Sequence, residues 1–317
     1  ERQLIRACLR RNLADRHLDL HLQPIVRLAD GMVVGYEDLC RPQDGESRPI
    51  DPQSFISEAE AAGLITPLGQ LVLERGFAAA AALQLPLHGR RLALNISTRQ
   101  LTRAGIATEL VAMAAGYALD PSSIALEVTE TALIGQAPLT RRELARLRDA
   151  GFRLILDDFG LGTSSFNWLA DEPIDGLKID RTLIAAIERD PRRRVLVAAI
   201  VGLARQLELE VVAEGVETCG QRELLLELGC DLAQGFLFSE DVRIEAVTDA
   251  FGRLALHGAA ALQLLRSVGL PTGALDADLA CVAFESPAGP VRAIRRDQAG
   301  VPGVEMFVSA DRVEALF

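Results

Sequence analysis

The sequence has few cysteines, few histidines and no long apolar run, and each shortage excludes a class of protein. Five cysteines occur in 317 residues without a Cys-x-x-Cys pair, which argues against a disulfide framework or a zinc ribbon and favours a reducing, cytoplasmic location. Four histidines are too few to favour an imidazole-based metal site. The longest apolar-leaning stretches, 76–89, 195–204 and 254–265, are too short to cross a bilayer, so we expect no membrane contact.

Basic residues are also in the minority. The chain has 33 Lys and Arg against 44 Asp and Glu, a formal charge of -11, which excludes the broad basic surface that nonspecific DNA binding requires. An anionic substrate would therefore need metal ions or a few placed cations. A content of 49% hydrophobic and 24% charged residues excludes disorder throughout. Because the chain begins at Glu1 without an apolar signal segment, we expect a piece of a longer protein, with a sensory or regulatory domain upstream.

Short runs rich in Val, Ile and Leu alternate with longer amphipathic stretches from about residue 20 to 240, which is typical of strands followed by helices. The predicted strands are Leu20–Leu28, Met32–Leu39, Arg91–Ile96, Ile124–Val128, Arg153–Leu156, Gly176–Ile179, Glu210–Ala213 and Leu232–Phe236. The predicted helices are Pro52–Ala62, Pro67–Leu83, Ile106–Tyr117, Pro138–Ala150, Leu183–Glu188, Pro191–Leu207 and Cys219–Leu228. This order favours an α/β fold, a (β/α)8 TIM-like barrel, over its rival, an open doubly wound sheet. The first two strands are separated only by Ala29-Asp30-Gly31, which predicts an antiparallel start.

The pattern changes after about Leu256. Gly269, Pro271 and Gly273 mark a break, and short strands are predicted at Ala280–Glu285, Val291–Arg295 and Glu305–Val308, before a closing helical turn. We therefore divide the chain into a barrel at residues 1–255 and a small β-containing accessory unit, without an assigned role, at residues 256–317.

Polar side chains follow the predicted strands at the point where each strand ends. They are Glu37, Asn95, Glu127, Asp157 with Asp158, Lys178, Glu214 and Gln234. Each alone could be a helix cap or a surface acid. In a strand–helix barrel, however, the carboxyl ends of the strands meet at the active-site face, so the whole series favours one shared site.

Converging carboxylates repel each other unless a cation neutralises them, and hard oxygen ligands favour Mg²⁺, Mn²⁺ or Ca²⁺ over zinc. The adjacent Asp157 and Asp158 are suited to a pair of metals, since one carboxylate can bridge both ions while its neighbour completes the second. Such a pair of metals is typical of enzymes that hydrolyse phosphoesters. Lys178 could position the attacking water, and Arg41 could hold a phosphate.

These residues lie in motifs that resemble the bacterial EAL-type cyclic di-GMP phosphodiesterases, in order and spacing, over roughly residues 5 to 250. The motifs are Gln23-Pro24-Ile25-Val26, Glu37-Asp38-Leu39-Cys40-Arg41, Asn95-Ile96-Ser97, Glu127-Val128-Thr129-Glu130, Asp157-Asp158-Phe159-Gly160, Leu177-Lys178-Ile179-Asp180, Ala213-Glu214-Gly215-Val216-Glu217-Thr218 and Gln234-Gly235-Phe236-Leu237-Phe238. Eight motifs in register are a specific signal, unlike a single glycine motif.

The resemblance implies an EAL barrel that cuts cyclic di-GMP to linear pGpG with two Mg²⁺ or Mn²⁺ ions, with Ca²⁺ inhibitory, and that forms a homodimer through the barrel. It implies that one metal is held by Glu37, Asn95, Glu127 and Asp157, and the other by Asp157, Asp158 and Glu214. Lys178 and Gln234 would position water beside the catalytic Glu37 and Glu214. Substrate contacts would come from Gln23, Leu39 and Arg41, while Glu130 would anchor the loop after Asp158, which in this family couples dimerisation to metal occupancy.

The sequence departs from the family pattern at three places. Asp38 replaces the usual Ala of the signature, although its side chain should point away from Glu37 on a strand. The loop after Gly160 reads Leu161-Gly162-Thr163-Ser164-Ser165, where a small residue and a tyrosine are more typical, which bears on loop-coupled regulation. Ser239-Glu240-Asp241 replaces the usual basic residue and proline.

Two other functions stay open at this point. A catalytically weak receptor would bind cyclic di-GMP without product and signal through partner domains, and incubation with nucleotide and Mg²⁺ or Mn²⁺ distinguishes it from the enzyme. Alternatively, Lys178 could be the Schiff-base lysine of a barrel aldolase, which borohydride trapping with a carbonyl substrate would detect. An aldolase, however, has no need of five carboxylates.

Overall fold

The chain forms two compact units, residues 1–244 and residues 245–317. The computed structural model describes residues 2–16, 18–44, 48–83, 85–133, 138–160, 169, 172–238, 242–243, 251–257, 281–286, 289–295 and 303–309. The division falls before the boundary expected at residue 255, because β10 (Phe251–His257) pairs along its whole length with β13 (Gly303–Ser309) near the end of the chain.

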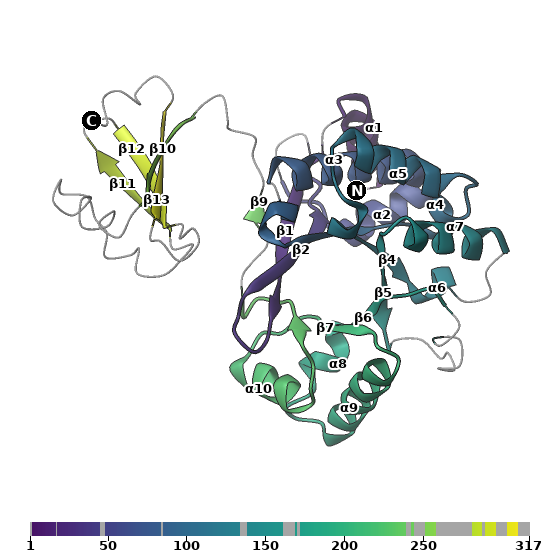
Figure 1. Cartoon of the computed structure of the whole chain (residues 1–317). Helices are drawn as coiled ribbons and strands as arrows, with labels where there is room; N and C mark the ends of the chain where they lie inside the picture. Colours follow the sequence, from purple (N-terminus) through teal and green to yellow (C-terminus); the bar gives the residue numbers. More distant parts are fainter. Residues whose placement is uncertain are drawn as a thin grey trace. The chain divides into compact units, whose positions relative to one another are not determined.

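Among the described residues of the first unit, eight strands close into a TIM-like barrel (Figure 1). They are β1 (Leu20–Arg27), β2 (Val33–Cys40), β3 (Arg91–Asn95), β4 (Ile124–Thr129), β5 (Arg153–Phe159), β6 (Gly176–Ile179), β7 (Glu210–Ala213) and β8 (Leu232–Ala233). Strands β2 to β8 are parallel in sequence order, and β1 closes the ring by pairing antiparallel with both β2 and β8. The predicted barrel is therefore confirmed, and the open doubly wound sheet is excluded.

The antiparallel start follows from the tight turn after β1. Asp30 accepts a hydrogen bond from the backbone amide of Met32 at 3.0 Å, and Gly31 has a φ of +71°, a left-handed conformation that glycine adopts without a steric cost. The amide of Arg27 donates to the carbonyl of Met32 at 2.8 Å. The turn leaves no room for a crossover helix, so β2 must run back beside β1.

A short strand, β9 (Val242–Arg243), also pairs with β1.

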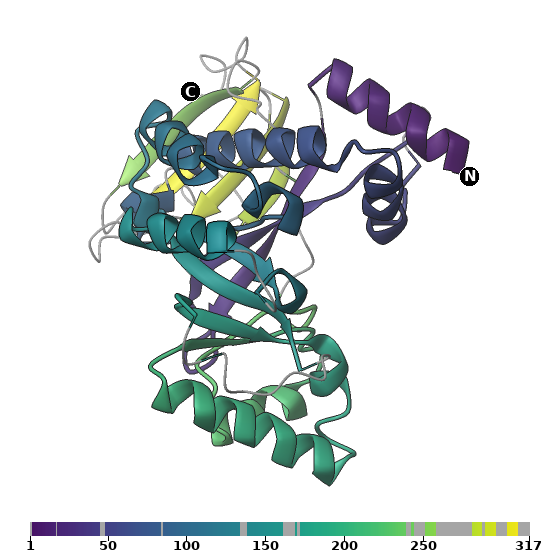
Figure 2. The same ribbon diagram turned by 90° about the vertical axis from the view of Figure 1, so that its right-hand side faces the viewer.

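Helices surround the ring of strands (Figure 1 and Figure 2). The α-helices are α1 (Arg2–Ala14), α2 (Pro52–Ala61), α3 (Ile65–Ala82), α4 (Thr98–Leu101), α5 (Ile106–Gly116), α6 (Glu130–Leu133), α7 (Pro138–Asp149), α8 (Arg181–Ala185), α9 (Pro191–Gln206) and α10 (Cys219–Glu227), with 3₁₀ turns η1 (Leu85–His88) and η2 (Pro121–Ser123). Asp51 and Asp190 cap α2 and α9, each followed by proline at the first turn, as helix starts favour. Helix α1 was not predicted; it packs with α2 and α3 in a core of its own.

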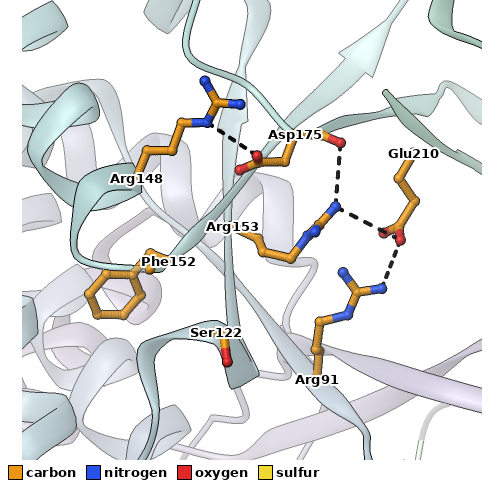
Figure 3. A pocket seen from close by; sticks show the side chains of 8 residues that line it. Arg91, Ser122, Arg148, Phe152, Arg153, Asp175 and Glu210 are labelled. Atoms are coloured by element: carbon orange, nitrogen blue, oxygen red, sulfur yellow. Dashed lines mark hydrogen bonds and ion pairs between the residues drawn. The ribbon is translucent and has the colours of Figure 1, made fainter. Parts of the chain in front are cut away.

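The inward-facing positions of the barrel change character along each strand. At the amino-terminal end, Arg91, Arg153 and Glu210 begin β3, β5 and β7 and lie close together (Figure 3). Two residues further along each strand comes a buried apolar layer inside the barrel, formed by Ile25, Ala93, Ala125, Ile155, Val212 and Leu232. Because side chains alternate between the two faces of a strand, the next inward positions are Asn95 on β3, Asp157 on β5 and Glu214 directly after β7. The polar strand ends therefore lie above an apolar floor.

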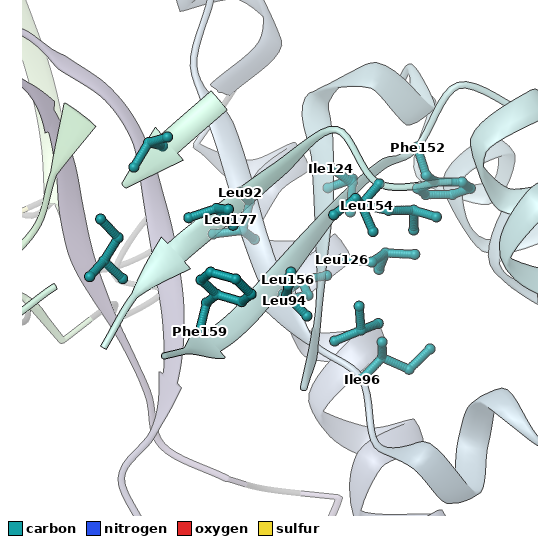
Figure 4. Close-up of a cluster of buried hydrophobic side chains, with 14 of the residues drawn as sticks. Leu92, Leu94, Ile96, Ile124, Leu126, Phe152, Leu154, Leu156, Phe159 and Leu177 are labelled. Atoms are coloured by element: carbon teal, nitrogen blue, oxygen red, sulfur yellow. The ribbon is translucent and has the colours of Figure 1, made fainter. Parts of the chain in front are cut away.

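The outward-facing positions of the same strands pack against the helices (Figure 4). These positions hold Leu92, Leu94, Leu126, Leu154, Leu156 and Leu177, each fully buried. Phe152, just before β5, meets Phe77 of α3 edge to face with ring centroids 6.3 Å apart, a favoured aromatic geometry. This outer core fixes the strands whose ends carry the polar series.

The second unit contains a four-stranded antiparallel sheet in the order β10-β13-β12-β11. It is built from β10, β11 (Cys281–Ser286), β12 (Gly289–Arg295) and β13, so the predicted β-containing extension is confirmed. The predicted closing helical turn lies outside the described residues. Within the part of the chain that the structure describes, no helix is both long and apolar enough to span a bilayer.

Candidate active site

Lys178 lies at the centre of the polar strand ends. Its side chain is 1% exposed, and it extends from β6 into the barrel. Four carboxylates surround its Nζ atom, at 2.6 Å for Glu214, 2.9 Å for Glu37, 3.1 Å for Glu127 and 3.5 Å for Asp157. These residues are distant in sequence, so the closed barrel is what brings them together.

Glu37 connects this cluster to two carboxamides. The side-chain nitrogen of Asn95 donates to Glu37 Oε1 at 3.2 Å, and that of Gln234 donates to Glu37 Oε2 at 2.6 Å. Gln234 also donates to Glu214 at 3.3 Å. Its Oε1 atom is buried and has no hydrogen-bond partner among the described residues. Such an atom is costly to leave unpaired, and a bound water or ligand would satisfy it.

Asp157 and Asp158 place their carboxylates at the same end of the barrel although they are consecutive. Consecutive side chains of a regular strand point to opposite faces, but the register of β5 against β6 shifts between Leu156 and Phe159. Asp158 also has a φ of +56°, which Asp tolerates better than most residues. As a result, one oxygen each from Asp157, Asp158 and Glu214 lies within 4.8 Å of the others.

The carboxyl groups of the cluster have different pKa values, because they are buried close to one another and to Lys178. Burial alone would raise the pKa of Glu37, but the Lys178 charge and hydrogen bonds from Lys178 and Gln234 outweigh it and lower the pKa. Burial and the neighbouring Glu37 charge raise the pKa of Glu127 well above its usual range. Burial raises the pKa of Glu214 to about 7 despite the nearby ammonium. The single positive charge of Lys178 is therefore too small to offset the negative charges of the carboxylates around it.

Burial alone would lower the pKa of Lys178, but the charges of Glu127, Glu214 and Glu37 outweigh it and raise the pKa well above its ordinary value. A Schiff-base lysine must lose its proton to attack a carbonyl, and such lysines have lowered pKa values. Lys178 remains an ammonium group, so the structure does not support the aldolase alternative.

The donor set fits hard divalent cations. Carboxylate and carboxamide oxygens are the ligands that Mg²⁺ and Mn²⁺ prefer, and the excess negative charge would be offset by binding them. The clustered side chains with such oxygens are Glu37, Asn95, Glu127, Asp157, Asp158 and Glu214.

The residues predicted to contact substrate lie on β1 and β2 or directly after β2. Gln23 on β1 is directly opposite Glu37 on β2, so the two side chains share the inward face. Leu39 is two positions after Glu37 and faces the same way, and Arg41 follows the end of β2. Glu130 is buried at the start of α6. The loop it was predicted to anchor, residues 161–168, lies outside the described residues, as do 239–241.

Asp38 points away from Glu37, as predicted, towards α3. A Cβ atom built on Gly76 of that helix would lie 3.1 Å from Asp38 Oδ2. Both carboxylate oxygens of Asp38 are buried without a hydrogen-bond partner among the described residues. Burial and the Glu37 charge raise the pKa of Asp38 to about 8, with Arg75 of α3 opposing the shift. No local pattern predicts this environment, since Arg75 lies in an ordinary helical stretch.

The last strand is shorter than predicted. We expected Leu232–Phe236, but β8 ends at Ala233, because the chain turns at Gly235 with a φ of +151°. The Gln234 carbonyl accepts from the Val216 amide at 3.0 Å, and the Val216 carbonyl accepts from Leu237 at 3.0 Å. This contact holds Gln234 beside the segment that follows Glu214.

Comparisons with known proteins agree with the geometry. The EAL domain family matches residues 6–241. Cyclic di-GMP phosphodiesterase NbdA of Pseudomonas aeruginosa is 40% identical over 247 residues, 76% of this chain and 31% of NbdA. Cyclic di-GMP phosphodiesterase RocR of the same organism is 34% identical over 229 residues, 72% of this chain and 58% of RocR. The chain therefore spans less than two thirds of either relative. The solved PaMucR phosphodiesterase, a c-di-GMP complex, is 36% identical with a TM-score of 0.69, covering 75% of this chain and 97% of that one.

Proposed function

Because the chain belongs to the EAL domain family, we propose that it hydrolyses cyclic di-GMP to linear pGpG with two divalent cations, Mg²⁺ or Mn²⁺. The observation that carries this proposal is the cage of four carboxylates around Lys178, with the Asp157–Asp158–Glu214 cluster beside it. NbdA and RocR, which are cyclic di-GMP phosphodiesterases by name, support the choice of substrate.

The proposed metal ligands are those that cluster at the strand ends. Glu37, Asn95, Glu127 and Asp157 would hold one cation, and Asp157, Asp158 and Glu214 the other. Bound cations of this kind supply charge stabilisation to the phosphodiester and lower the pKa of water. The side chains of this chain would then orient the reacting groups around them.

Lys178 and Gln234 would act on water and substrate. The ammonium of Lys178 donates hydrogen bonds and would offset negative charge on the phosphoryl oxygens. The unpartnered Oε1 of Gln234 would accept a hydrogen bond from the water and so fix the orientation of that water. Gln23, Leu39 and Arg41 would contact the nucleotide, with the Arg41 guanidinium suited to a phosphate.

Regulation and assembly are part of the same proposal. Since the chain covers 31% of NbdA, we propose that a sensory or regulatory domain accompanies the barrel in the longer protein. We also propose a cytoplasmic homodimer formed through the barrel, in which Glu130 anchors the loop after Asp158.

Product analysis tests the activity. Incubation of the protein with cyclic di-GMP and Mg²⁺ or Mn²⁺ should give linear pGpG on chromatography, while EDTA should abolish turnover and Ca²⁺ should inhibit it. Glu37→Gln and Lys178→Met should each lower kcat by at least about 100-fold, as the loss of one electrostatic contact at a reacting centre does. Glu60→Gln, which removes an exposed acid of α2, is the matched control and should leave kcat unchanged.

Two results would contradict the enzyme. Binding of cyclic di-GMP without any product would indicate a receptor instead. If Glu37→Gln or Lys178→Met retained turnover, and EDTA still abolished that turnover as in the parent protein, the reaction would take place outside this cluster.

A further inference from the structure

A cavity lies at the amino-terminal end of the barrel strands (Figure 3), whereas the carboxylate cluster lies at their carboxyl ends. Its volume is about 530 Å³, within the range of small-molecule sites and far above the roughly 30 Å³ that one water occupies in the liquid. We call it the basal cavity. Its polar lining consists of Arg91, Ser122, Arg148, Arg153, Asp175 and Glu210.

The charges of this lining do not balance. Arg91 pairs with Glu210 at 2.8 Å, and Arg148 pairs with Asp175 at 3.2 Å. Arg153 must share Glu210 with Arg91, at the longer distance of 4.0 Å. Three guanidinium groups thus face two carboxylates in the lining, which leaves one positive charge in excess.

Arg153 is the residue with the least satisfied side chain of the three. One Nη atom donates to the backbone carbonyl of Asp175 at 3.5 Å, which is a long contact. Its Nε atom is buried and has no hydrogen-bond partner within the residues that the structure describes. An anion against the exposed part of this guanidinium, whose side chain is 35% exposed, would offset the excess charge, and the guanidinium fork matches the oxygens of a phosphate.

The two carboxylates add a second requirement. Asp175 and Glu210 accept hydrogen bonds, and the Ser122 side chain is exposed to the cavity. A bare anion would leave most of the space unfilled and the carboxylates facing it. A ligand that carries an anionic group on a body with several hydroxyl donors uses both kinds of partner.

We propose that the basal cavity is a second ligand site, which binds a small phosphate monoester with a polyhydroxyl body, such as a sugar phosphate or a nucleoside monophosphate. The phosphate lies against Arg153, Arg148 and Arg91, and the hydroxyl groups donate to Asp175 and Glu210. This site is separate from the proposed phosphodiesterase site, because the apolar layer around Ile155 and Val212 lies between the two ends of the strands.

The same strands connect the two sites. Arg91, Arg153 and Glu210 begin β3, β5 and β7. Each lies four positions before a residue of the carboxylate cluster, namely Asn95, Asp157 and Glu214. A ring of charges at this end could instead serve only to hold the strand starts together, since residues at the amino-terminal face of such barrels commonly stabilise the fold. A ligand site and a purely structural ring of charges differ in whether a small molecule binds to the basal cavity.

Isothermal titration calorimetry on the whole chain in EDTA tests the proposal, since chelation keeps divalent cations out of the other site. The probes are ribose 5-phosphate, glucose 6-phosphate and AMP, with inorganic phosphate and ribose as the two halves of the ligand. We expect saturable binding of at least one monoester, weaker binding of phosphate and none of ribose. Arg153→Gln should raise the dissociation constant of the monoester at least tenfold, and Arg148→Gln should raise it several-fold.

Arg192→Gln removes the same charge from the exposed start of α9 and should leave binding unchanged. Because Arg153→Gln could disturb the fold, the half-exposed Arg148 provides an independent variant, and thermal unfolding checks both. No saturable binding of any of the three monoesters would overturn the proposal. So would binding that stays unchanged in folded Arg148→Gln and Arg153→Gln.

Discussion

Asp38 shows how burial beside a functional cluster can keep an acidic residue protonated. Its carboxylate is buried beneath α3 with no hydrogen-bond partner in the described part of the chain, and burial raises its pKa to about 8. The strand period predicts its direction correctly. The free-energy cost of burying this carboxyl group arises because α3 covers it. The packing of α3 over Asp38 cannot be predicted from the local sequence pattern.

We expect Asp38→Asn to change how stability depends on pH. A carboxyl whose pKa rises from 3.8 to about 8 on folding keeps a proton that the unfolded chain releases. Its stabilising contribution is therefore complete below pH 4 and is lost as the pH rises towards 8. Between pH 5 and pH 8 this loss is at most about 4 kcal/mol in the free energy of unfolding, and Asn, which does not titrate, avoids it.

Urea unfolding of the EDTA-treated protein at pH 5 and pH 8 measures this difference. The gain in unfolding free energy of Asp38→Asn over the parent chain should be larger at pH 8 than at pH 5, and Glu60→Gln should show no such trend. Equal gains at the two pH values would mean that Asp38 is ionised in the folded protein.

Among the elements, the ends of the strands decide where the functional side chains lie. Strands β6 and β7 match their predicted bounds, Gly176–Ile179 and Glu210–Ala213, because each is a short β-rich run between clear breaks. The end of β8 and the bulge of β5 could not be predicted. Both depend on contacts with a neighbouring strand or loop, at Gly235 and Asp158, and not on the residues of the strand itself.

Gly235 should be intolerant of substitution. A Cβ atom added there would lie 2.3 Å from the backbone N and O atoms of Val216, which cannot move without breaking the contact beside Glu214 and Gln234. We expect Gly235→Ala to lower the free energy of unfolding by about 2 to 4 kcal/mol and to reduce hydrolysis of cyclic di-GMP strongly.

Gly202→Ala is the matched control for this prediction. Gly202 lies in α9 with nothing within 4 Å of an added Cβ, so alanine should stabilise the helix by about 0.5 to 1 kcal/mol and leave hydrolysis intact. Urea unfolding and product chromatography on both variants make the comparison. Normal stability and turnover of Gly235→Ala would show that the approach of the two segments is not needed.

The whole chain divides into two units, and the functional proposals concern only the first. The EAL family match, residues 6–241, lies within the first unit, residues 1–244. The order of apolar and amphipathic runs along the sequence predicts a barrel followed by a β-containing unit. It could not predict the basal cavity, because Arg91, Arg153 and Glu210 each look like an ordinary charged residue at the start of a strand until the barrel closes.

We expect a truncated chain of residues 1–244 to fold and to hydrolyse cyclic di-GMP. This segment keeps β9 on β1 and every strand of the closed barrel. A chain that ends at residue 231 lacks β8, which pairs with both β7 and β1, and should not fold cooperatively. Circular dichroism during thermal unfolding compares the two, and a non-cooperative 1–244 segment would show that the barrel needs the second unit.

The location of bound metal tests the central claim most directly. Crystals of the full chain grown with cyclic di-GMP and Mn²⁺ can be measured for anomalous scattering, which identifies manganese without reference to any assumed ligand. We predict two anomalous peaks at the carboxyl ends of the barrel strands, one in contact with Glu37, Asn95, Glu127 and Asp157 and the other with Asp157, Asp158 and Glu214. Nucleotide bound at this end with no manganese beside these side chains would contradict the account.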